Sequence, residues 1–177
     1  MHLSAEIIER KNELLLALRR EMNGAVAGSM RDGGIEYGLN FGVSVPTIRS
    51  VASRYAGDDE LASEVWKSGV RELRLAGLFI ATPELLAQEA WSGAVDTFEV
   101  AENYVWSLSR SEAALRSVVA RLAGSERLMD RYMTLMAYAR KPLWFSAEEV
   151  ERACSEAEHS TEPALQRVAD NLRIRLE

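Results

Sequence analysis

Apolar residues along the chain recur at helical spacing, and polar caps, glycines and prolines separate one group from the next. The first group follows Ser4, a good helix cap, and we expect its members on one side of a helix: Ile7, Ile8, Leu14, Leu15 and Leu18. No segment shows a convincing strand pattern. The pattern therefore predicts an all-α fold.

The same punctuation predicts about ten or eleven helices joined by short turns. A helix at 70–81 is almost wholly apolar, so we expect it to be buried at the centre. Capping-box spacing at 96–99 and 146–149 marks two further starts. The other helices are expected at 4–22, 25–30, 45–55, 60–68, 83–93, from 109 or 111 to 124, at 128–140 and from 161 onward.

The long apolar helices near residues 70, 97, 126 and 162 recur at intervals of about 30 residues. A period of that length is typical of an α-solenoid, a superhelix of HEAT-like helix pairs. We therefore expect one HEAT-like repeat domain over residues 1–177. An irregular helical bundle is the alternative.

Composition excludes several classes of protein. No apolar run approaches the roughly 20 residues of a membrane span, and the N-terminus has no cleavable apolar core. One cysteine, Cys154, cannot form an intrachain disulfide, and with His2 and His159 it cannot build a zinc site. These features favour a cytoplasmic protein with no membrane partner, no metal and no cofactor.

Charge is spread unevenly along the chain. The formal net charge is −6, which argues against strong non-specific binding to nucleic acid. Residues 103–141 nevertheless carry seven Lys/Arg against three Asp/Glu, whereas the segments on both sides are acidic. This basic middle segment indicates either a surface that faces a polyanion or an ordinary set of solvated helix faces.

The helix expected at 45–55 has a specific entry. Ser44 is suited to cap it, Pro46 is tolerated in its first turn, and Gly42 permits a tight turn or a close approach. Arg49 would then project from the first turn, where a helix favours anions. The alternatives are a phosphate or carboxylate site and a surface arginine that pairs with a glutamate.

Two stretches, YGLNFGVSVPTIRSVA and DDELASEVWKSGVRELRLAGLFIATPELL, carry a family pattern in the same order and at the same separation. Together they resemble the DNA alkylation repair family, the AlkD-type DNA glycosylases, over about residues 30–90. The matching positions are Gly42, Val43, Pro46, Arg49, Ala52, Leu61, Ala62, Trp66, Glu72, Arg74, Ala76 and Pro83. The resemblance implies a right-handed superhelix of HEAT-like repeats whose concave basic groove holds duplex DNA.

The resemblance also implies an activity, the metal-independent excision of positively charged alkylated bases such as N3- and N7-alkylpurines. The family carries Trp-x-x-x-Asp on a groove-lining helix, and here Phe98 stands for the tryptophan and Glu102 for the aspartate. The carboxylate would stabilise a cationic transition state and help direct water. Glu102→Asp, which restores the carboxylate length of the family, is expected to raise activity. Arg131 occupies the position of an arginine that contacts DNA.

The sequence is consistent with three functions. The protein is an alkylated-base DNA glycosylase, a catalytically inactive homologue that still binds duplex DNA, or a helical-repeat scaffold for a protein partner. A basic concave surface would favour the first two, and the residues expected on it are Arg49, Arg74, Arg110 and Arg131. The sequence does not determine the oligomeric state.

Overall fold

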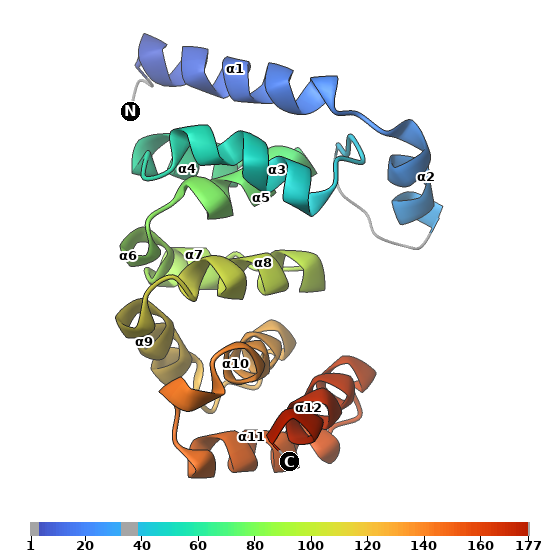
Figure 1. The fold of residues 1–177 in the computed structure, drawn as a ribbon, viewed down its shortest axis with the longest axis vertical. Helices are drawn as coiled ribbons and strands as arrows, with labels where there is room; N and C mark the ends of the chain where they lie inside the picture. The colour runs from blue at the N-terminus through green and yellow to red at the C-terminus, as the bar shows by residue number, and fades with distance from the viewer. Residues whose placement is uncertain (1–3, 33–38, 177) are drawn as a thin grey trace. The chain divides into compact units, whose positions relative to one another are not determined.

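The computed structural model describes residues 4–32 and 39–176, and within them the chain is all-α, as predicted. Two residues of the motif, Tyr37 and Gly38, lie outside the described residues, as does His2. The chain divides into two compact units, Met1–Thr82 and Pro83–Glu177, whose helices are labelled in Figure 1. The superhelix of HEAT-like repeats and the single domain remain predictions.

The first unit is built around a buried central helix, as the apolar pattern predicted. This helix, α5 (Arg71–Ile80), packs against α3 (Val45–Ala52) and α4 (Asp59–Trp66), and every residue in it is buried except the half-buried Arg74. The helices of this unit are α1 (Ala5–Arg20), α2 (Gly24–Asp32), α3 (Val45–Ala52), the 3-10 helix η1 (Ser53–Tyr55), α4 (Asp59–Trp66) and α5 (Arg71–Ile80).

Helix α1 departs from its expected apolar side at one position. Ile7, Leu14 and Leu18 are fully buried, because steps of seven and eleven residues return to nearly the same face of a helix. Ile8 is 47% exposed, since it points about 100° away from Ile7. The prediction that Ile8 shares the buried face is therefore wrong.

In the second unit, four helices pack against α10 (Leu128–Arg140): α8 (Phe98–Leu108), α9 (Glu112–Leu122), α11 (Ala147–Glu158) and α12 (Pro163–Leu176). The start and end of α10 agree with the sequence prediction. The helices of this unit are α6 (Pro83–Leu86), α7 (Glu89–Gly93), α8 (Phe98–Leu108), α9 (Glu112–Leu122), α10 (Leu128–Arg140), the 3-10 helix η2 (Pro142–Trp144), α11 (Ala147–Glu158) and α12 (Pro163–Leu176). Cys154 is fully buried in α11, and this burial raises the pKa of its thiol.

The single helix expected at 83–93 is instead two short helices, α6 and α7. Gln88 between them is extended, and side chains distant in sequence occupy the carbonyls at the break. The Tyr104 hydroxyl donates to Leu86 O at 2.6 Å, and Arg121 Nη1 donates to Ala87 O at 2.9 Å. These tertiary hydrogen bonds take the place of intrahelical ones.

The capping residues agree with the sequence prediction at two helices and differ by one residue at a third. Ser146 forms the predicted capping box with Glu149, and Ser44 caps α3 through the Thr47 amide. The cap of α8 is Thr97, which accepts from the Val100 amide, so the box expected from Asp96 is wrong by one residue.

The loop before α3 explains the glycine of the motif. Gly42 has φ of +71°, and a Cβ there would lie 2.1 Å from Asn23 O and 2.7 Å from the Ala27 nitrogen. The loop therefore requires both the left-handed backbone and the close approach that the sequence offered as alternatives. On its other side, Leu39 and Val70 form an isolated parallel bridge.

A buried ion pair at the start of α5 holds the same loop. Glu72 is fully buried, and its carboxylate accepts from the amides of Phe41 at 3.1 Å and Val43 at 3.3 Å. Arg71, 3% exposed, donates from Nη1 to Glu72 Oε1 and to Val43 O, both at 2.9 Å. The motif positions Gly42, Val43 and Glu72 thus form a clamp that fixes the entry to α3.

We expect Gly42→Ala to destabilise the first unit by about 3–5 kcal/mol, from left-handed strain of about 1–2 kcal/mol plus a backbone clash. Gly57→Ala is the matched control, because Gly57 also has a positive φ, +86°, but a Cβ there meets nothing within 4 Å. Gly57→Ala should therefore be destabilised only by the left-handed strain. Denaturant unfolding measures the loss of stability in both variants. Equal losses would show that a Cβ at position 42 does not clash with the backbone.

No helix among the described residues is long and apolar enough to cross a membrane.

Candidate functional site

Phe98 and Glu102 lie one turn apart on α8, and both side chains are exposed. The four-residue spacing predicted that they share one face of the helix. The first turn is fixed by the Thr97 cap, and the opposite face of the helix buries Val100, Ala101, Tyr104 and Val105. An aromatic ring and a carboxylate are therefore presented together from a well-packed helix.

Both members of this pair contact Tyr132 of α10, which the sequence analysis did not identify. The Tyr132 hydroxyl donates to Glu102 Oε1 at 2.7 Å. Its ring lies 4.6 Å from the Phe98 ring, centroid to centroid, with the planes tilted by 60°. We call Phe98, Glu102 and Tyr132 the α8–α10 cluster.

Burial raises the pKa of the Tyr132 phenol, and the hydrogen bond and the charge of Glu102 raise it further. The positive charge of Arg167 on α12 opposes this rise. The phenol therefore keeps its proton at neutral pH. Because an ionised carboxylate only accepts hydrogen bonds, Tyr132 is the donor in its contact with Glu102.

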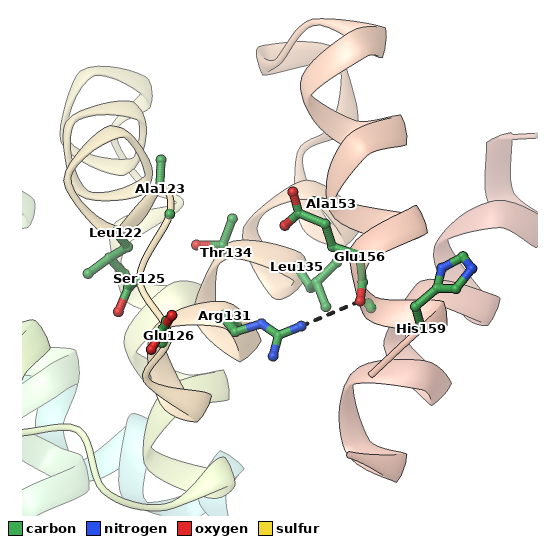
Figure 2. Close-up of a pocket in the computed structure, with 12 residues that line it drawn as sticks. Leu122, Ala123, Ser125, Glu126, Arg131, Thr134, Leu135, Ala153, Glu156 and His159 are labelled. Carbon is green, nitrogen blue, oxygen red and sulfur yellow. Dashed lines mark hydrogen bonds between the residues drawn. The ribbon is translucent and has the colours of Figure 1, made fainter. Parts of the chain in front are cut away.

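Arg131 precedes Tyr132 in sequence but has different neighbours. Its Nη2 donates to Glu156 O at 3.4 Å, across a pocket of about 690 Å³ (Figure 2). The pocket is lined by residues of the α9–α10 turn, α10 and α11, and it carries charge of both signs from Glu126, Arg131 and Glu156. Successive helical residues point about 100° apart. A surface shared by Arg131 and the α8–α10 cluster remains a prediction.

His159, the C-cap of α11, also lines this pocket. Its Nδ1 lies 2.7 Å from Ser155 O, and since a carbonyl only accepts, Nδ1 carries a proton. Within the described residues, no group of three or more His, Cys, Asp or Glu side chains is arranged to hold a metal ion.

In the first unit, the two predicted DNA-contacting arginines lie over aromatic rings. The Arg49 guanidinium is 5.2 Å from the Phe79 ring centroid, and that of Arg74 is 4.7 Å from the Trp66 ring. Arg49 lies in the last turn of α3, because α3 ends at Ala52. The prediction that it projects from the first turn is therefore wrong, and the helix N-terminus does not assist it.

Arg110 and other arginines of the basic middle segment bind backbone carbonyls within the second unit. Arg110 Nε donates to Ser107 O at 2.9 Å. Three further arginines form such bonds, Arg116 to Trp144, Arg121 to Ala87 and Arg127 to Ser92 and Val95. These contacts give the clustered positive charge a structural role in addition to any role in binding.

Over residues 14–167 the chain matches the family described as DNA alkylation repair enzyme. No curated protein and no solved structure matches the chain. The match includes both units and the α8–α10 cluster, which extends the resemblance well beyond residues 30–90. The AlkD-type subdivision remains a prediction. The chain belongs to the DNA alkylation repair family.

Proposed function

We propose that this protein is a DNA glycosylase that binds duplex DNA and releases cationic alkylated bases without a metal. The observation that supports this proposal best is the α8–α10 cluster. It places an exposed carboxylate, Glu102, beside an exposed ring, Phe98, at the two positions that resemble the family's catalytic pair. Membership of the DNA alkylation repair family supports the same conclusion.

The proposed reaction suits a fixed anion. An N3- or N7-alkylated purine carries a positive charge. The bond between its glycosidic nitrogen and the sugar C1′ therefore breaks with the electron pair going to the base. The base leaves neutral, and the sugar becomes an oxocarbenium-like cation. The Glu102 carboxylate stabilises that cation, water adds to C1′, and the water's proton passes to solvent. Phe98 covers the sugar beside it.

The direct test of this function is the release of base from a methylated duplex, with protein in excess over DNA so that weak activity is detected. Release of N3- or N7-methylpurine by the wild-type protein is the expected result. If the duplex is bound but no base is released, the protein is a recognition protein without catalysis. If no duplex is bound, the scaffold function replaces both.

Arg131→Ala should weaken duplex binding and lower the slope of log affinity against log salt by about 1, because one phosphate contact releases about one counterion. Arg173→Ala is the matched control in the same unit, since Arg173 is already held by Glu151 and Glu158. Its slope should equal that of the wild type. An unchanged slope for Arg131→Ala in a salt titration would remove Arg131 from the DNA-contacting set.

Arg49, Arg74 and Arg110 are the other proposed phosphate contacts. Arg49 and Arg74 are half-buried over their rings, and Arg110 is exposed. A guanidinium presents five N–H donors in a planar fork that matches the geometry of a phosphate. The same proposal includes a cytoplasmic location and the binding of DNA by an α-solenoid.

A further inference from the structure

We infer that Tyr132 is a positioning residue for base excision, which holds the Glu102 carboxylate in the orientation that faces the sugar. The inference rests on the proposed function. Three observations carry it: the 2.7 Å hydrogen bond from the Tyr132 hydroxyl to Glu102 Oε1, the burial of the Tyr132 ring, and the contact of that ring with Phe98.

The need for such a residue follows from the length and exposure of Glu102. A glutamate has three side-chain torsions, and an exposed one on a helix samples several rotamers. Electrostatic catalysis requires the anion to be fixed before charge develops on the sugar. A hydrogen bond from a fixed donor removes much of this freedom at one carboxylate oxygen, so that Oε2 is directed as well.

Tyr132 is suited to be that fixed donor. It is 6% exposed and lies in α10, against which four other helices of the unit pack. Its ring is already immobilised, so binding Glu102 costs little further side-chain entropy. Its ring also packs against Phe98, so a single residue orients both members of the pair.

The contact changes the expectation for the shorter side chain. The resemblance alone predicts that Glu102→Asp raises activity, because it restores the family's aspartate. In this structure, one methylene fewer draws the carboxylate away from the Tyr132 hydroxyl. We therefore expect Glu102→Asp to excise more slowly than the wild type.

The experiment measures single-turnover release of methylated purine and duplex affinity for five proteins: wild type, Tyr132→Phe, Tyr138→Phe, Glu102→Asp and the double variant Glu102→Asp/Tyr132→Phe. Tyr138 is the matched control, because it is 4% exposed on the same helix and packs edge-on against Phe145 rather than against Phe98. Tyr132→Phe keeps the ring and removes only the hydroxyl.

Tyr132→Phe should release base about 10- to 100-fold more slowly, as expected for misplacement of a catalytic group by about 1 Å, with unchanged duplex affinity. Tyr138→Phe should match the wild type. In the Glu102→Asp background, Tyr132→Phe should cost little more, because the hydroxyl acts through the longer carboxylate.

Two results would overturn the inference while the proposed function stands. One is an active wild type with an equally active Tyr132→Phe, and the other is an equal loss in Tyr132→Phe and Tyr138→Phe, which indicates a packing effect. A wild type that releases no base overturns the proposed function itself, and the positioning role with it.

Discussion

Replacing Glu102 with glutamine is expected to abolish measurable base release and to leave duplex binding intact. Glutamine preserves the shape of the side chain and still accepts the hydrogen bond of the Tyr132 hydroxyl, but it lacks the negative charge. Loss of one preorganised electrostatic group at a transition state costs about 100- to 1000-fold in rate. Single-turnover release from methylated duplex measures the loss.

Glu99→Gln is the control for this substitution. Glu99 lies on the same helix, three residues before Glu102, and is half-buried, so the variant changes the charge of α8 by the same amount. It should keep the wild-type rate. An equal loss in both variants would mean that the net charge of the helix matters rather than the Glu102 carboxylate, and an active Glu102→Gln would exclude Glu102 as the catalytic anion.

The sequence predicts local structure well, because helix starts and stops depend on neighbouring residues. Ser44, Ser111 and Ser146 cap the helices that they precede. The break between α6 and α7 was missed, since it depends on hydrogen bonds from Tyr104 and Arg121. No pattern within 83–93 records these distant donors.

The sequence predicted the part of the candidate site that lies on α8 but not the part that lies on α10. A spacing of four residues is enough to bring Phe98 and Glu102 to one face of α8. Tyr132 is 30 residues further on, and only the packing of α8 against α10 brings it to Glu102. The one available sequence signal for Tyr132 was its position directly after Arg131, a predicted groove arginine. Arginine counts likewise did not reveal that Arg116, Arg121 and Arg127 bind carbonyls.

Glu72 illustrates the same limit in the first unit. The resemblance identified the position, and the mostly apolar helix around it indicated burial. Neither revealed that its carboxylate accepts two loop amides, because the loop is about 30 residues earlier in the chain. At least part of the motif is therefore explained by a role in folding rather than by contact with DNA.

Glu72→Gln is expected to destabilise the first unit by about 3–5 kcal/mol, since it removes one charge of the buried Arg71–Glu72 ion pair. The amide also replaces one acceptor oxygen by a donor, which then faces the N–H of Phe41 or Val43. Denaturant unfolding measures the loss. Glu6→Gln, which breaks an exposed pair with Arg10, should leave the unfolding midpoint unchanged.

Removing both charges should not rescue this site. Replacing a buried ion pair by apolar residues is often neutral, but here the carboxylate also accepts the Phe41 and Val43 amides. In Arg71→Met/Glu72→Met those amides lose their partners, at about 1–3 kcal/mol for each buried group. We therefore expect the double variant to stay well below the wild type in stability, with faster hydrogen exchange at Phe41 and Val43. A double variant as stable as the wild type would mean that the clamp contributes nothing to the entry into α3.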